Sequence, residues 1–95
     1  MTDQDLTNRL RLLRRTVLTF QTELRYHRVD EQLVSAIDEQ MERGIATEGR
    51  CRHLCETVDA LRESMITPRT ELWADTVRAC DKLLDAIEAV LVRLR

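Results

Sequence analysis

The sequence predicts an all-α fold, an antiparallel helical bundle of three long helices plus one short helix, with coiled-coil-like seams. The chain of 95 residues has two glycines and one proline, too few for the turns of an all-β protein. Leucine, arginine, glutamate and alanine dominate, and all four are good helix formers. Apolar residues recur at steps of three and four, the heptad spacing of packed helices. This length predicts a single helical-bundle domain over residues 1–95.

The first helix is expected from about Asp3 to Arg28. Thr2 can cap it, and Asp3 favours the positive end of the helix dipole. Its inward seam follows heptad steps and comprises Leu6, Leu10, Leu13, Val17, Phe20 and Leu24. His27 extends this seam and is expected to be half-buried near the helix end.

A short second helix and a longer third helix follow. Asp30 is a plausible cap for the second helix, and Gly44 a plausible stop. The third helix is expected to start near Thr47, which can cap it. Its inward seam comprises Cys51, Leu54, Val58, Leu61 and Met65.

The fourth helix has the widest apolar face. Thr67 and Pro68 give it a strong start signal, a cap followed by proline at the first helical position. Seven seam residues run from Trp73 to Leu94, and Leu72, Leu83 and Val90 widen the seam to about half of the circumference. A face this wide contacts several helices or keeps part of its surface for another chain. We therefore expect Leu72, Leu83 and Val90 to be partner-binding residues, and a homodimer to form through this helix.

A basic face lies opposite the seam of the first helix. On a helical wheel, Arg11, Arg14, Arg15 and Arg25 cluster there, with Leu18 among them. Such a face can bind an acidic partner or phosphates, or it can simply face water. Arginine is favoured at protein interfaces because its planar fork binds carboxylates in pairs. We expect these five residues to contact a protein partner.

Nucleic-acid binding through the same arginines is the alternative. The net charge of −2 and the lack of aromatic residues among the arginines disfavour it. The sequence therefore favours a small protein–protein interaction module, such as an adaptor, a chaperone-like partner or an inhibitor, that binds through helix faces.

Chemistry at the histidines and cysteines has weaker support. His53 is expected to be exposed, which permits histidine phosphotransfer as a further alternative, although the lysine and glycine typical of such domains do not follow it. Cys51 and Cys55 share one helix face, but His53 lies away from them, so a zinc site is disfavoured. Buried, reduced thiols are the ordinary interpretation of Cys51, Cys55 and Cys80.

Other classes of function lack their sequence signatures. Gly-rich phosphate loops and the common hydrolase and metalloprotease motifs are absent, so we expect no enzyme, no metal and no cofactor. Charged residues make up 34% of the chain, and no apolar run reaches the ~18 residues of a membrane span. The first ten residues lack the apolar core of a signal peptide. We expect a cytoplasmic protein without a membrane-spanning segment.

Overall fold

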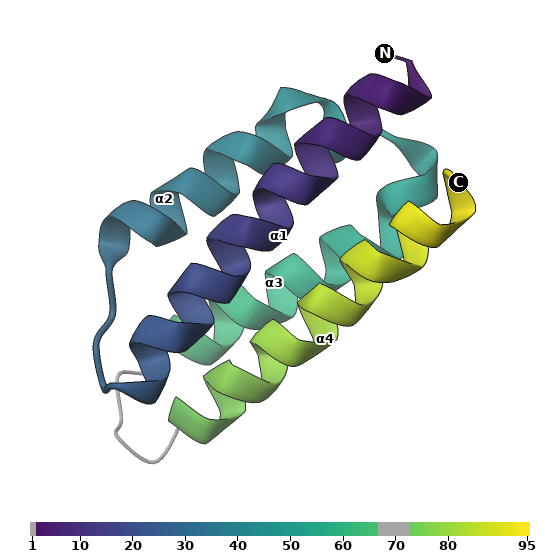
Figure 1. The fold of residues 1–95 in the computed structure, drawn as a ribbon. Coiled ribbons are helices and arrows are strands. Elements are labelled where there is room, and N and C mark those ends of the chain that lie inside the picture. The colour runs from purple at the N-terminus through teal and green to yellow at the C-terminus, as the bar shows by residue number, and fades with distance from the viewer. Residues whose placement is uncertain (1, 67–72) are drawn as a thin grey trace.

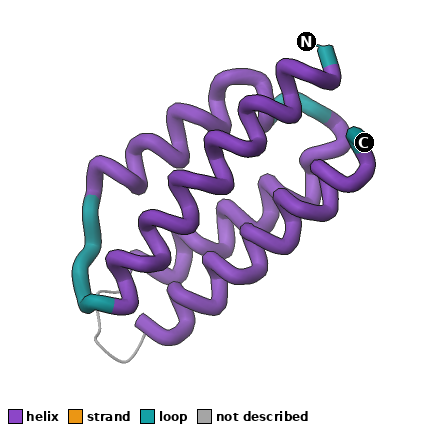
Figure 2. Tube along the Cα trace, viewed as in Figure 1, coloured by secondary structure: helices purple, strands orange, loops and turns teal. Residues whose placement is uncertain are grey.

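The computed structural model describes residues 2–66 and 73–95, and these residues form a bundle of four helices (Figure 1). The helices are α1 (Asp3–Arg25), α2 (Glu31–Gln40), α3 (Arg52–Ile66) and α4 (Trp73–Arg93). Two short helical turns, η1 (Met41–Ile45) and η2 (Gly49–Cys51), join α2 to α3. No strand occurs in the described part of the chain, and a short loop connects α1 to α2 (Figure 2). The expected all-α bundle of three long helices and one short helix is confirmed.

The helices are antiparallel neighbours along an elongated molecule of 41 × 20 × 19 Å. α1 packs against α2 on one side and against α4 on the other, and α4 also packs against α3. α1 and α4 therefore each contact two neighbouring helices. This arrangement determines which side chains of these two helices are buried and which remain on the surface.

The parts of the core from α1 and α3 are the seams that the heptad spacing predicts. All six expected seam residues of α1 are buried, with Phe20 the largest fully buried side chain. In α3, Leu54, Val58 and Leu61 are buried as expected, and Met65 is partly buried against them. Burial of these apolar side chains is the main favourable contribution to folding.

α1 begins where the sequence predicts and ends earlier. The Thr2 hydroxyl accepts a hydrogen bond from the backbone N–H of Asp5 at 3.1 Å, which confirms the cap. At the other end, the backbone N–H groups of His27 and Arg28 donate to the carbonyls of Leu24 and Glu23, both at 2.9 Å. This pair of bonds ends the helix, with His27 in the left-handed conformation at φ 59°. The expectation of a half-buried His27 that continues the seam is wrong, because the helix stops at Arg25 and leaves His27 exposed.

The chain between α2 and α3 reverses at Gly44. Asp30 caps α2 as expected, since its Oδ1 accepts from the N–H of Gln32 at 2.9 Å. Gly44 has φ 102° and ψ −9°, a conformation that costs residues with a Cβ atom. Glu48, and not Thr47, caps the next helical turn, because its carboxylate accepts from the N–H of Arg50 at 3.4 Å. The expected stop at Gly44 is confirmed, and the expected cap at Thr47 is wrong.

We predict that Gly44→Ala lowers the free energy of unfolding by about 1–2 kcal/mol, because alanine must adopt the left-handed conformation there. Gly49→Ala is the matched control: a Cβ atom at Gly49 meets nothing within 4 Å, and its φ is not positive. Urea unfolding of both variants measures the difference. Equal stability of the two variants would contradict the role that we assign to Gly44.

The wide apolar face of α4 is used within the chain. Leu83 is 0% exposed and Val90 is 5% exposed, so both belong to the core. They lie on the same side of the helix as Thr76, whose hydroxyl accepts a hydrogen bond from the Ser64 hydroxyl of α3 at 3.1 Å. Leu91 faces the opposite neighbour, α1.

The expectation that Leu83 and Val90 form spare surface for a partner is therefore wrong, because α4 sits between two helices and buries both flanks of its face. Leu72 lies outside the described residues, as do Thr67 and Pro68 of the expected start signal. With Leu83 and Val90 buried within the chain, no spare apolar side of α4 is left among the described residues to favour a homodimer.

Buried polar side chains set the relative positions of the helices. The Gln21 amide of α1 donates to the Val77 carbonyl at 3.1 Å and to Asp81 Oδ1 at 2.6 Å, both on α4. On the other side of α1, the Gln40 amide of α2 donates to the Thr16 hydroxyl at 3.0 Å. Since a shift of either helix would leave these partly buried donors unpaired, the bonds favour one register of the bundle.

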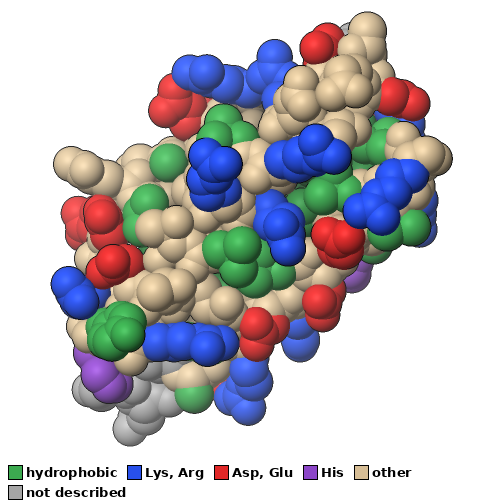
Figure 3. All heavy atoms as spheres, viewed as in Figure 1, with side chains coloured by type: hydrophobic (Ala, Val, Ile, Leu, Met, Phe, Trp, Pro, Cys, Tyr) green, Lys and Arg blue, Asp and Glu red, His purple; other side chains and the backbone are tan. Residues whose placement is uncertain are grey.

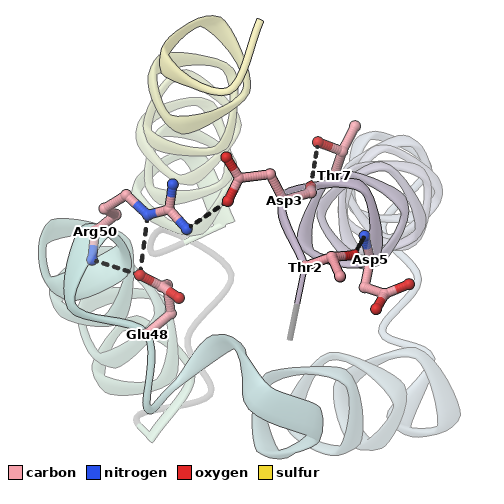
Figure 4. A network of polar contacts seen from close by, with 6 residues as sticks. All are labelled: Thr2, Asp3, Asp5, Thr7, Glu48 and Arg50. Atoms are coloured by element: carbon pink, nitrogen blue, oxygen red, sulfur yellow. Dashed lines mark hydrogen bonds and ion pairs between the residues drawn. The ribbon is translucent and has the colours of Figure 1, made fainter.

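A surface network ties the start of α1 to the turn before α3 (Figure 4). The Arg50 guanidinium lies 3.0 Å from Asp3 Oδ1 and 3.0 Å from Glu48 Oε1. Hydrogen bonds from the Arg50 side chain and backbone lower the pKa of the Glu48 carboxyl, and the two carboxylates raise the pKa of Arg50. The Arg50 side chain is therefore fully engaged in holding two segments together.

Candidate functional site

A basic hollow lies between α1 and α4. Its volume is about 480 Å³. We call it the arginine groove, and it is lined by Arg11, Arg14, Arg15 and Leu18 from α1, by Glu88 and Leu91 from α4 and by Arg95, which follows α4. In Figure 3, Lys and Arg side chains surround hydrophobic side chains on the face that α1 and α4 form.

The position of the groove follows from the register of α1 and α4. Arg11, Arg14 and Leu18 are spaced by three and four residues, so they share the flank of α1 that faces α4. Gln21 continues this flank and is bonded to Val77 and Asp81 of α4. The same hydrogen bonds that align the helices therefore bring the arginines beside the last two turns of α4.

Four guanidinium groups face one carboxylate in this groove. The Arg14 Nε atom lies 3.9 Å from Glu88 Oε2, and an Arg95 terminal nitrogen lies 3.8 Å from Glu88 Oε1. Both contacts are long for ion pairs; the side chains of Arg14 and Glu88 are about half exposed, and that of Arg95 is mostly exposed. The side chains of the groove thus carry a net excess of three positive charges, only loosely compensated.

The floor of the groove is apolar. Leu18 is 39% exposed, and Leu91 beneath the arginines is 8% exposed. A partly exposed leucine among charged side chains offers apolar surface to a partner. The aliphatic stems of the neighbouring arginines can cover part of that surface. The groove therefore combines a hydrophobic contact with a surplus of carboxylate-binding groups.

The sequence predicted four of the seven residues that line the groove. Three of the four expected arginines and Leu18 line the groove, whereas Arg25 lies on the same helix beyond its lining. The contributions of Glu88, Leu91 and Arg95 were missed. Their spacing of three and four residues places them on one side of α4, but the sequence could not show which side meets α1.

A second hollow lies between α3 and α4. Small side chains form much of it, among them Thr57, Ala60, Ser64 and Ala79, and Lys82 lies at its edge. Arg78 also lines it, and this arginine is paired with Asp75 on the same helix. The hollow has neither the apolar anchor nor the charge surplus of the arginine groove, so it does not define a ligand.

His53 is exposed, as the sequence predicts, in the first turn of α3. Its Nδ1 atom lies 3.5 Å from Glu56 Oε2. A carboxylate at this position repels an incoming phosphoryl group, so the geometry does not favour phosphotransfer through His53. Phosphotransfer stays an untested alternative.

The three cysteines are free thiols in the structure. Cys51 and Cys80 are fully buried, and burial raises the pKa of Cys51 to about 11 and that of Cys80 to about 12. Cys55 is partly exposed; burial also raises its pKa, with a smaller contribution from Asp59. In the described residues, no group of three or more His, Cys, Asp or Glu side chains could hold a metal ion.

These environments predict the order in which the thiols react. In native protein at pH 8, a disulfide-exchange reagent should modify one thiol per chain quickly, at Cys55, because only thiolates react and the other two thiols are buried and neutral. Absorbance of the released thiol measures the rate. Cys55→Ser should remove the fast phase, and a fast phase that persists in this variant would contradict the burial of Cys51 and Cys80.

None of the helices in the described residues is both long enough and apolar enough to cross a membrane. Comparison with protein-family models, with curated proteins and with solved structures finds no match to the chain. The function is therefore inferred from the geometry and charge of the arginine groove.

Proposed function

We propose that this protein is a protein-binding module whose arginine groove docks an acidic segment of a partner protein. The observation that carries the proposal is the surplus of guanidinium groups around the partly exposed Leu18. Adaptor, chaperone-like partner and inhibitor are roles that such a module can serve, and none of them requires a second copy of the chain.

The chemistry of the groove fits carboxylates. A guanidinium group presents a planar fork that binds a carboxylate through two parallel hydrogen bonds. Arg11 and Arg15 have no carboxylate among the side chains that line the groove, apart from the Glu88 that Arg14 and Arg95 share. Carboxylates of a partner can therefore be added without breaking a strong internal ion pair.

A protein partner is favoured over a nucleic acid for two reasons. Glu88 within the groove and the net charge of −2 repel a nucleic-acid backbone, which has one charge on every phosphate, more strongly than a peptide with a few carboxylates. The lining also contains leucines and no aromatic side chain on which bases could stack. Nucleic-acid binding through the same arginines is the competing outcome of the experiment.

The experiment compares ligands of equal charge. Fluorescence anisotropy at low and physiological salt would measure binding of a labelled peptide rich in glutamate and leucine and of DNA and RNA oligonucleotides. We expect the peptide to bind, and the double variant Arg11→Glu/Arg15→Glu to abolish its binding. Arg9→Glu/Arg52→Glu is the matched control, because both are exposed arginines that do not line the groove and the pair changes the net charge equally.

Two results would overturn the proposal. One is binding of the oligonucleotides without binding of the peptide, which would identify the groove as a phosphate-binding surface. The other is peptide binding that Arg9→Glu/Arg52→Glu weakens as much as Arg11→Glu/Arg15→Glu does, which would show that only overall charge matters.

A further inference from the structure

The exposed side of α1 carries a regular pattern that extends beyond the groove. Arg11, Leu18 and Arg25 are spaced by seven residues and are all exposed. Seven residues are about two helical turns, or ~10 Å, so the three side chains form a nearly straight line along the helix. An exposed apolar residue therefore lies midway between two guanidinium groups.

The shape of the surface favours a helix as the occupant. α1 and α4 are antiparallel neighbours, and the furrow between two packed helices accepts the ridge of a third helix. The distance from Arg11 to Arg25 is about 21 Å along the axis, which an amphipathic helix of about four turns would span. Carboxylates on such a helix, two turns to either side of an apolar residue, would face Arg11 and Arg25 while the apolar residue contacts Leu18.

Glu88 occupies the place of a partner carboxylate. Its carboxylate forms long ion pairs with two arginines from different segments, Arg14 of α1 at 3.9 Å and Arg95 after α4 at 3.8 Å. Its side chain is 47% exposed, so solvent screens both pairs. A carboxylate that approaches from outside can therefore replace Glu88 as the partner of these arginines.

We propose that the arginine groove binds an acidic amphipathic helix of a partner protein, with its apolar anchor on Leu18, and that Glu88 is an internal competitor which the partner's carboxylates displace from Arg14 and Arg95. The inference rests on the proposed function and adds the conformation of the partner and the role of Glu88. It makes Glu88 a residue that lowers the affinity of the site to which it belongs.

The first experiment tests the helix and its register. The probe is a labelled alanine-based peptide of about 18 residues, with a central leucine and glutamates four and seven residues to either side. The control peptide has the same composition in scrambled order. We expect the ordered peptide to bind more tightly and to gain helical circular dichroism on binding. Equal affinities would overturn the helical register.

The second experiment tests Glu88 with the variant Glu88→Gln, which keeps the shape of the side chain. We expect the ordered peptide to bind about threefold to fivefold more tightly to this variant at low salt, because two weak surface pairs no longer compete. Asp85→Asn is the matched control, since Asp85 is an exposed carboxylate of α4 outside the lining and its neutralisation changes the net charge equally. An affinity for Glu88→Gln equal to or below that for Asp85→Asn would overturn the competitor role.

The results separate this inference from the proposed function. If the peptide binds and the Arg11→Glu/Arg15→Glu variant does not bind it, but register and Glu88→Gln have no effect, only the further inference fails. If neither peptide binds the unmodified protein, the proposed function fails with it. Far-ultraviolet circular dichroism and thermal unfolding of each variant show that the bundle is intact.

Discussion

Leu83→Ala is expected to lower the free energy of unfolding by about 2–5 kcal/mol. Leu83 is fully buried on the side of α4 that faces α3, so the substitution removes apolar contacts and leaves a cavity in a closely packed core. A domain of this length has a total stability of only about 5–14 kcal/mol, so a loss of this size is easily measured by urea unfolding.

Val92→Ala is the matched control for Leu83→Ala, because Val92 lies on the same helix and is 54% exposed. Its stability should change by no more than about 0.5 kcal/mol. A comparable small change in Leu83→Ala would mean that Leu83 is not buried by α3, and the surface role that the sequence predicts for it would return.

Phe20→Ala is expected to have the largest effect of any single core substitution described here, a loss of about 3–5 kcal/mol. Phe20 is the largest fully buried side chain and lies in the seam of α1, between α2 and α4. Thermal and urea unfolding measure the loss. Because this variant could fall close to the limit of stability, Phe20→Leu provides a second measurement, with an expected loss of about 1–2 kcal/mol.

Leu12→Ala is the control for Phe20, since Leu12 is also on α1 and is 51% exposed. Its effect should be within about 0.5 kcal/mol. If Phe20→Leu were as mild as Leu12→Ala, the packing that we describe around α1 would be contradicted.

The seam of α1 was predictable from the sequence, and the widened seam of α4 was predictable only as a pattern. A narrow heptad stripe such as Leu6 to Leu24 predicts the buried side of its helix, because these side chains can avoid water only by facing the core. A stripe that covers half of the circumference can contact either a second helix of the same chain or a helix of another chain. In α4, Leu83 and Val90 are buried within the chain, where α4 packs against α3.

The ends of the helices show the same division. Thr2, Asp30 and Gly44 act through local backbone geometry, so their roles were visible in the sequence. His27 was expected to continue the seam, but two backbone hydrogen bonds end the helix before it. Position 27 holds a histidine and not the glycine that usually marks such a stop, so the end of the helix was not visible in the local sequence.

Only part of the arginine groove was predictable from the sequence. The sequence placed Arg11, Arg14, Arg15 and Leu18 on one exposed face of α1, because helical periodicity alone decides which side chains of a helix lie together. It could not show that Glu88, Leu91 and Arg95 complete the site, since their position depends on the side of α4 that meets α1.

By itself, then, the sequence determined the helical class, the inner faces of α1 and α3 and the basic face of α1, all of which follow from short-range periodicity and local capping. Only the tertiary structure decided which helices are neighbours, and with them the burial of Leu83 and Val90 and the position of Glu88 among the arginines. The physical reason is that contacts between residues far apart in the chain depend on how all four helices share one core, and no single helix carries that information.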